Sequence, residues 1–173
     1  VIVQPTHVIN GIENDLMKED ALAFKNRFER ITFGDPLLTT QQDHVEIVNA
    51  ICQEFSNLPA DCALILMGHG TSHYANDVYA ALDYRFKDLG FSNIHLATVE
   101  GYPTLENVTR MVKEQEAKKV ILAPFMIVAG DHARNDMSGD DEDSWKNQFR
   151  AAGYDVECRM KGLGEYPAIQ DML

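Results

Sequence analysis

Three residues of the types that bind metals in proteins recur along the chain at nearly equal distances. Glu100 lies 31 residues after His69, and His132 lies 32 residues after Glu100. Both separations match one strand–helix–strand repeat, which takes roughly 30 residues. Two imidazoles and one carboxylate suit a divalent first-row ion such as Co²⁺, Ni²⁺, Fe²⁺ or Zn²⁺ and leave coordination positions open for a substrate. The spacing favours a metal site over the alternative that these are helix caps or loop residues without a ligand.

The stretch around His69 indicates how such a residue would be presented. An apolar run from Leu64 to Met67 opens into Gly68-His69-Gly70, which is typical of a buried strand that ends at the rim of a sheet. Glycine has no Cβ atom and permits backbone angles that are closed to other residues. We therefore expect Gly68 and Gly70 to let a flat ligand approach the backbone, and His69 to bind a metal or move a proton.

Three further residues are candidates for contact with a substrate or for its chemistry. His7 follows the first predicted strand much as His69 follows a later one, so we expect His7 and Glu13 at the equivalent edge of a related unit, facing a cleft. Glu13 also falls in a predicted first helical turn, where a carboxylate stabilises the helix dipole for ordinary reasons. The pattern alone favours that ordinary role. Tyr102, two residues after Glu100, is a candidate for substrate binding.

The elements that position these residues follow from the alternation of strand and helix periods. It predicts an α/β fold with parallel sheets covered by helices on both faces. A strand at 1–4 is expected to be buried, and a helix at 13–30 is expected to turn its apolar residues, Leu16, Leu22, Ala23 and Phe28, toward a core. Further strands are predicted at 31–33, 62–67, 93–99, 120–128 and 154–158, and further helices at 40–55, 77–89, 104–117, 143–152 and from about residue 165.

The best candidate for a domain boundary is the Asn-Leu-Pro-Ala stretch at residues 57–60. A histidine-containing turn follows a predicted strand on each side of it, at His7 and at His69, which indicates a weak duplication. We predict that residues 1–58 are the C-terminal part of a truncated first α/β domain. Residues 59–173 are predicted to form one complete second α/β domain, with its last helix cut short.

Composition excludes several classes of protein. The 173 residues carry a formal net charge of −12, which argues against nucleic acid as a partner because phosphates require clustered lysine and arginine. No apolar stretch approaches the roughly 20 residues that cross a bilayer, so no membrane association is expected. The three cysteines lack a C-x-x-C pattern and indicate reduced thiols in the cytoplasm. The chain begins inside an apolar run, which leaves an export signal open. Nucleotide-binding glycine motifs and the G-x-S-x-G motif of hydrolases are absent from the sequence.

Motifs along nearly the whole chain resemble those of one enzyme family. They are 4–11 with Glu13, 67–70, 99–100 with 102–103, 128–133 with 135–137, 143–146, and 162–165 with 167–168. The Val-Ala-Gly-Asp-His block at 128–132 is highly specific. On these residues the chain resembles the sirohydrochlorin cobaltochelatases of anaerobic cobalamin synthesis, which are class II tetrapyrrole chelatases related in fold to ferrochelatase.

The resemblance implies two similar α/β domains with the tetrapyrrole, sirohydrochlorin or precorrin-2, in the cleft between them. It also implies that His69, Glu100 and His132 bind the metal and that Glu13 has a supporting acidic role. Insertion of Co²⁺ must remove two ring N–H protons, so His69, His132 and Glu13 are the expected catalytic residues. Cobalt would be a substrate, and no organic cofactor is expected. The sequence leaves a homo-oligomer open.

Three other functions stay open at the level of sequence. A chelatase for Ni²⁺ or Fe²⁺ would use the same ligands, because affinity order does not set the physiological metal. A carrier that binds metal or tetrapyrrole without catalysis would need the same sheet edge. A zinc hydrolase would hold its ion with His69, Glu100 and His132 but would not bind a tetrapyrrole.

Overall fold

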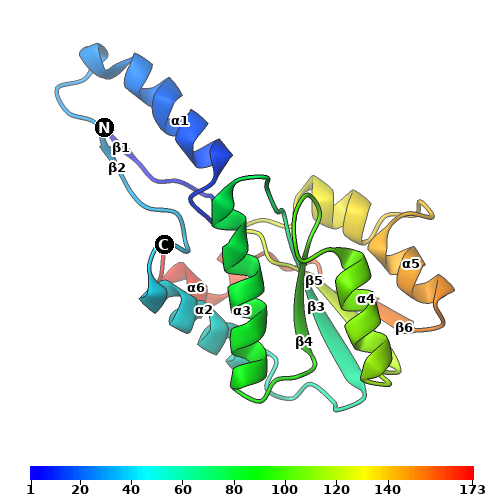
Figure 1. Cartoon of the computed structure of the whole chain (residues 1–173). Helices are drawn as coiled ribbons and strands as arrows, with labels where there is room; N and C mark the ends of the chain where they lie inside the picture. The colour runs from blue at the N-terminus through cyan, green and yellow to red at the C-terminus, as the bar shows by residue number, and fades with distance from the viewer.

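A computed structural model describes residues 1–173 (Figure 1). The strands are β1 (Ile2–Val3), β2 (Thr32–Phe33), β3 (Cys62–Gly68), β4 (Ile94–Thr98), β5 (Lys119–Pro124) and β6 (Asp155–Cys158). The α-helices are α1 (Ile12–Ala23), α2 (Gln41–Glu54), α3 (Asp77–Asp88), α4 (Leu105–Glu114), α5 (Trp145–Ala151) and α6 (Pro167–Gln170). Short turns of other helix types lie at Lys25–Arg27, Tyr74–Asn76, Ala133–Met137 and Leu163–Glu165.

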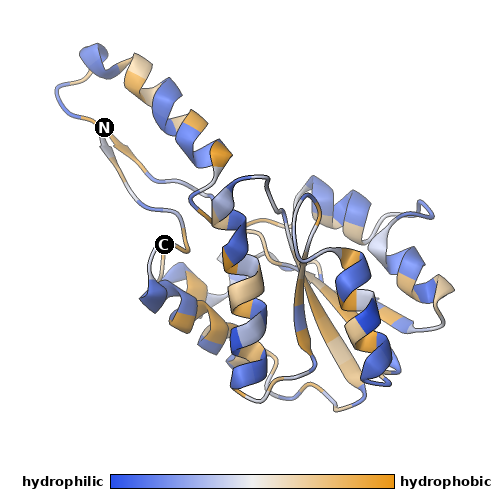
Figure 2. Cartoon of the chain, in the orientation of Figure 1, coloured by the Kyte–Doolittle hydropathy of each residue, from blue (hydrophilic) through white to orange (hydrophobic).

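The main body is built on a four-stranded sheet in the order β4-β3-β5-β6, with all neighbouring strands parallel. All seven residues of the central strand β3 are buried. Such a strand needs apolar residues on both faces, which explains why its sequence is continuously apolar rather than alternating. Figure 2 shows these strands as hydrophobic ribbons between helices with hydrophilic outer faces. The predicted α/β fold with parallel, helix-covered sheets is confirmed.

Each face of the sheet has its own hydrophobic core. On one face Leu64 and Leu66 of β3 pack with residues of α2, α3 and α6. On the other face Ile65 and Met67 pack with residues of α4, α5 and the turn at Ala133–Met137. Successive residues of one strand therefore supply both cores, because side chains alternate between the faces of a sheet. The sheet edge between the two cores is held rigidly on both sides.

Helix α2 belongs to the main body. Its residues Ile47, Ile51 and Phe55 are buried in the same core as Leu64 and Leu66, together with Leu37 and Leu38 that precede the helix. The boundary predicted at 57–60 would divide one hydrophobic core. The same core also includes Val8 and Ile9 from the first part of the chain, so residues on both sides of 57–60 pack together.

Most residues before Leu37 form an arm that extends away from the main body in Figure 1, whereas Val8 and Ile9, between β1 and α1, are buried in the core of the main body. The arm contains α1 and the two-stranded parallel sheet of β1 and β2. The strand predicted at 1–4 spans only Ile2–Val3 and is not buried, since Ile2 is 80% exposed. The helix predicted at 13–30 ends at Ala23.

The apolar side chains of the arm also differ from the prediction. Leu16, Leu22 and Phe28 are exposed rather than turned toward a core, and Asn14 is the one buried residue of α1. An amphipathic period predicts which side of a helix is apolar, but it does not supply the surface that covers that side.

Several helices and strands begin or end at other residues than the apolar pattern predicts, because local signals set their ends. Threonine caps begin α2 and α4, where Thr40 and Thr104 accept from the backbone three residues later. Helix α4 ends at Glu114, and Glu116 has a positive φ of 55°. The strand predicted at 120–128 ends at Pro124, and the loop from Phe125 to Gly130 follows it. None of the helices is both long enough and apolar enough to cross a membrane.

Candidate metal and tetrapyrrole site

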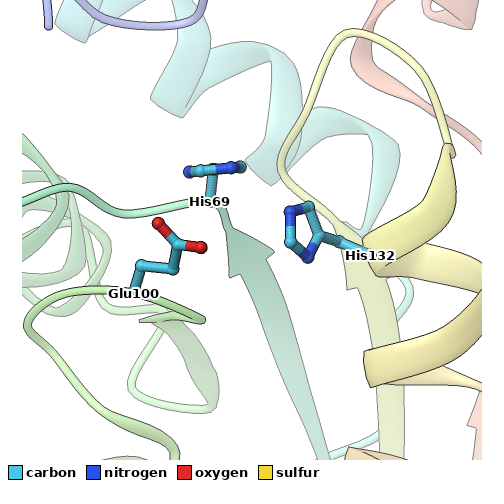
Figure 3. Close-up of side chains that lie close together, drawn as sticks. All are labelled: His69, Glu100 and His132. Carbon is cyan, nitrogen blue, oxygen red and sulfur yellow. The ribbon is translucent and has the colours of Figure 1, made fainter. Parts of the chain in front are cut away.

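His69, Glu100 and His132 meet at the carboxyl edge of the sheet. Each offers one ligand atom, and the three atoms all lie within 4.8 Å of one another. Figure 3 shows the three side chains converging from separate segments: His69 at the end of β3, Glu100 on the loop after β4, and His132 at the start of a helical turn. The predicted juxtaposition of the three residues is confirmed.

Backbone hydrogen bonds beyond the strands place Glu100 beside His69. The Val99 amide donates to the Gly68 carbonyl at 3.1 Å, and the Glu100 amide donates to the His69 carbonyl at 2.8 Å. The parallel pairing of β3 and β4 thus continues two residues past the last residue of β4. A ligand on each of two neighbouring strands is brought together by the register of the sheet, without a contact between their side chains.

His132 reaches the same place by a different route. Seven residues separate it from the end of β5, of which Phe125 to Gly130 form a loop, so it is not delivered directly by a strand end as the spacing argument supposed. It precedes a five-residue π-helical turn, Ala133–Met137. Ala133 and Met137 are fully buried in the core that contains Ile65 and Met67. That anchorage fixes the turn and the direction in which His132 points.

The two imidazoles contact each other edge to face, with centroids 4.7 Å apart and planes at 88°. Nδ1 of His69 lies 2.7 Å from the Gly70 carbonyl, and Nδ1 of His132 lies 2.5 Å from Oδ2 of Asp136. A carbonyl oxygen can only accept, so Nδ1 of His69 carries the hydrogen and Nε2 keeps its lone pair. Both histidines therefore leave Nε2 with its lone pair available, which is the atom that an imidazole held at Nδ1 can offer to a metal.

A cavity of about 310 Å³ adjoins this cluster and includes His69 in its wall. Its other polar residues include His7, Glu13 and Thr71, and its apolar wall is formed mainly by Val8, Ile9, Met126, Ile127 and Val128. His7 and Glu13, which the sequence predicts at an edge that faces a cleft, line the same cavity as His69. His69 is the one residue that belongs both to the metal cluster and to the cavity wall.

Tyr79 also lines the cavity and is 2% exposed. Burial raises the pKa of its hydroxyl to about 12; the nearby Glu13 carboxylate adds to the rise, and a backbone contact with Gly70 opposes it. Tyr79 is therefore a neutral hydroxyl at physiological pH. It can donate a hydrogen bond into the cavity but cannot accept a proton there as a phenolate.

Gly68 and Gly70 are required by internal packing, which differs from the predicted role. A Cβ atom on Gly68 would lie 2.8 Å from the ring of Tyr79. Gly70 has φ of +83°, and a Cβ there would lie 2.7 Å from the Gly101 backbone nitrogen. Gly70 lines the cavity, whereas Gly68 is buried in β3 and does not. The glycines let Tyr79 and the loop after β4 approach the strand end, and so act on the site indirectly.

Comparison with known proteins gives the family of this chain. The whole chain, residues 1–173, matches the family described as cobalt chelatase (CbiK). The chain belongs to the cobalt chelatase family. It is 38% identical over 172 residues to a sirohydrochlorin cobaltochelatase of Salmonella typhimurium, and 33% identical over 178 residues to sirohydrochlorin cobaltochelatase CbiKC of Nitratidesulfovibrio vulgaris. Each alignment covers 99% of this chain but only 65% and 62%, respectively, of the relative.

Solved structures of chelatases share the fold. SirB from Bacillus subtilis with Fe³⁺ superposes with a TM-score of 0.67, covering 99% of this chain and 67% of the other. The sirohydrochlorin chelatase SirB from Bacillus subtilis subspecies spizizenii, in complex with cobalt, gives a TM-score of 0.60 and covers 64% of its chain. Sequence identity is 13% in both cases. The chelatase-like architecture that the motifs implied is thus confirmed at the level of fold.

One residue that was predicted to contact substrate lies elsewhere. The Tyr102 side chain is 59% exposed and is not part of the cavity wall. Its carbonyl accepts from the amide of Asn76 at 2.7 Å, and Asn76 also accepts from the Thr71 amide. Tyr102 therefore helps to tie the loop after β4 to the segment after His69, through its backbone. The side chain of Tyr102 therefore does not point toward the cavity, although Tyr102 lies only two residues after Glu100 in the sequence.

Sequence reasoning missed other members of the site. Asp136 follows His132 by four residues, a spacing that places two side chains on one face of a helical turn, so a helical prediction at this point would have found it. Residues 126–128 hold their shape through the C-terminal turn, because Leu163 and Gly164 donate to the carbonyls of Met126 and Ile127. A Cβ on Gly162 would lie 2.5 Å from the Ile127 carbonyl oxygen. The Gly-Leu-Gly motif thus supports the cavity wall from behind.

Proposed function

We propose that this protein inserts a divalent metal, Co²⁺, into sirohydrochlorin. The observation that carries the proposal is the position of His69, which belongs to a three-residue metal cluster and also to the wall of the adjoining cavity. A metal held by the cluster would lie next to any ring in that cavity. The names of the relatives, both sirohydrochlorin cobaltochelatases, support the substrate and the metal.

The donor set fits the proposed metal substrate. Two imidazole nitrogens and one carboxylate oxygen suit cobalt and leave positions for water or ring nitrogens. Neutral imidazoles exchange ligands while they hold the ion, and the Glu100 carboxylate offsets part of its charge. Glu100 is exposed and His69 and His132 are half-buried, so the ion can arrive from solvent on one side and leave toward the cavity on the other.

The cavity fits the ring substrate in two respects. Its apolar wall at Val8, Ile9 and 126–128 can contact the face of a flat macrocycle, and its volume of about 310 Å³ lies within the range of small-molecule sites, about 300–1,000 Å³. Insertion replaces two ring N–H protons by the metal, so acceptors must face the ring centre. We assign this role to Glu13 and His7, which line the cavity opposite His69. Nδ1 of His7 is buried and has no hydrogen-bond partner in the chain, so it is available to a bound substrate.

The proposal also includes a role for the arm, which would form part of the substrate site outside this cavity. The apolar side chains of the arm, Ile12, Leu16, Leu22, Phe24 and Phe28, are exposed, and the curated relatives are longer than this chain. We propose that the arm belongs to a first α/β unit, which would cover those side chains and complete the cavity wall. This moves the boundary ahead of its predicted position at 58.

Insertion of iron is the second candidate function, because two histidines and one carboxylate also form the usual site of non-haem Fe²⁺. A cytoplasmic location belongs to the proposal as well, and the three cysteines are free thiols, as expected of a reducing compartment. Sirohydrochlorin is preferred to precorrin-2 as the ring because both relatives are named for it.

The decisive experiment measures metal insertion from the absorbance change of sirohydrochlorin under anaerobic conditions. The intact protein should accelerate Co²⁺ insertion well above the spontaneous rate, and faster than Fe²⁺ or Ni²⁺ at equal free concentrations. A rate equal to the spontaneous rate, with the ring bound and released unchanged, would favour a carrier instead. Faster insertion of Fe²⁺ would replace cobalt by iron in the proposal.

A further inference from the structure

The two histidines of the metal cluster have different partners behind them. Nδ1 of His132 lies 2.5 Å from a carboxylate oxygen of Asp136, and both side chains are partly buried, at 33% and 45% exposed. Nδ1 of His69 lies 2.7 Å from a backbone carbonyl, that of Gly70. A carboxylate carries a full negative charge and a carbonyl only a partial one. Hydrogen bonds to an ionised acceptor are roughly twice as strong as neutral ones.

The contact between His132 and Asp136 is fixed by the turn that carries it. Ala133 and Met137 are each 0% exposed and pack in the core beneath the turn. The amide and hydroxyl of Ser138 both donate to the Ala133 carbonyl, at 3.2 and 2.8 Å, and close the turn. The core-facing residues of the turn are therefore anchored. His132 and Asp136, four residues apart in the sequence, are thereby held next to each other on the side of the turn that does not face the core.

This difference sets the strength of the two metal ligands. A carboxylate that holds Nδ1–H makes Nε2 of the same ring a stronger electron donor and restricts the ring to one orientation. His132 gains both effects from Asp136. His69 gains only a weaker hydrogen bond to its own neighbour, and it is also the ligand that lines the cavity.

We propose that Asp136 is a positioning residue that makes His132 the anchoring ligand, and that His69 is the ligand that yields the ion to the ring. The proposal rests on the metal binding included in the proposed function and deepens it by assigning an order of ligand release. The ion would leave His69 first because that bond is weaker and faces the cavity. Asp136 acts through His132 and touches neither ring nor metal.

The test is a titration with Co²⁺ alone, followed by the visible absorption of the bound ion. Asp136→Asn keeps the shape of the side chain and one acceptor oxygen but removes the charge. It should raise the Kd for Co²⁺ about 10- to 100-fold. Glu142→Gln, an equal loss of charge at an exposed residue of the next turn, should leave the Kd within about twofold. An unchanged Kd in Asp136→Asn, with Co²⁺ bound normally by the unsubstituted protein, would overturn the positioning role and leave the proposed function standing.

Double variants separate this role from a general effect on the turn. In the His132→Ala background, Asp136→Asn should cause no further loss of Co²⁺ affinity, whereas in the His69→Ala background it should cause the same fold-loss as in the unsubstituted protein. His132→Ala should weaken Co²⁺ binding more than His69→Ala. An equal loss in both backgrounds would show that Asp136 does not act through His132. Failure of the unsubstituted protein to bind Co²⁺ would overturn the proposed function, and this inference with it.

Discussion

At the scale of single residues, His69 is the point where the two parts of the site join. It contributes a ligand atom to the cluster with Glu100 and His132, and its ring forms part of the cavity wall with His7 and Glu13. Its Nδ1 is held by the Gly70 carbonyl, so Nε2 is free for the metal. One side chain thus links the proposed metal site to the proposed binding site of the ring.

Loss of either histidine should therefore stop insertion. We expect His69→Ala and His132→Ala each to lower the rate of Co²⁺ insertion by more than about 100-fold, because removal of a ligand exceeds the roughly 10- to 100-fold cost of changes behind it. His44→Ala is a suitable control, since His44 lines a separate pocket beside α2. The absorbance of the tetrapyrrole reports the rate, and the fluorescence of the buried Trp145 reports the fold. Near-normal insertion by either ligand variant would contradict the proposed function.

At the scale of elements, the end of β3 depends on glycines that allow close packing. Gly70→Ala places a Cβ 2.7 Å from a backbone nitrogen and forces a side chain into a positive φ. We expect the free energy of unfolding to fall by about 1–3 kcal/mol. Gly130→Ala is the matched control, because a Cβ there meets nothing within 4 Å, and it should change stability by less than about 0.5 kcal/mol. Urea unfolding measures the stability of both variants. Equal stabilities of Gly70→Ala and Gly130→Ala would refute the packing argument.

The outer edge of β4 is covered by an ion pair from α3. Lys87 donates to the Ile94 carbonyl at 2.7 Å, and Asp83 accepts from the Leu96 amide at 2.8 Å. His95, which is 0% exposed, has Nδ1 at 3.2 Å from the Lys87 amine and Nε2 at 2.9 Å from Gln115. Backbone groups that an edge strand would leave unpaired are thus satisfied by side chains, which prevents pairing with another chain.

This edge should make stability depend on pH. Burial, and then the positive charge of Lys87, lower the pKa of His95 in the folded state. The unfolded chain binds that proton near pH 6.5, so the contribution of neutral His95 is present above this pH and is lost as the pH falls below it. The free energy of unfolding should decline as the pH falls below about 6.5, by at most about 1.4 kcal/mol per pH unit for one proton. The slope should be smaller in His95→Gln; an identical slope would exclude His95 as its source.

At the scale of the whole molecule, the net charge of −12 favours the approach of a cation to the exposed Glu100 and repels a polyanionic ring. Such a ring must be held by local groups, and by surfaces beyond the main body. The exposed apolar side chains of the arm mark where such a surface would pack. Under the proposed function, the two substrates would therefore reach the site under opposite long-range forces.

Binding of the metal should stabilise the whole fold, because the three ligands come from separate segments that only folding brings together. At a free Co²⁺ concentration 100 times its Kd, the free energy of unfolding should rise by about 2.7 kcal/mol. Thermal unfolding followed by Trp145 fluorescence would measure the change, and a chelator should reverse it. The rise should be largely lost in His132→Ala. A similar rise in that variant would mean that Co²⁺ stabilises the protein at another site.

The alternation of strands and helices, and with it the meeting of His69, Glu100 and His132, could be predicted from the sequence alone. Strand periods, threonine caps and the spacing of His69, Glu100 and His132 are local or periodic features, and parallel strands share one edge by geometry. Tertiary structure decided the rest. Only packing could place α2 in the main body, leave the apolar side of α1 uncovered, turn Tyr102 away, and bring Asp136 behind His132. Those outcomes depend on which distant surfaces meet, and no local period encodes that.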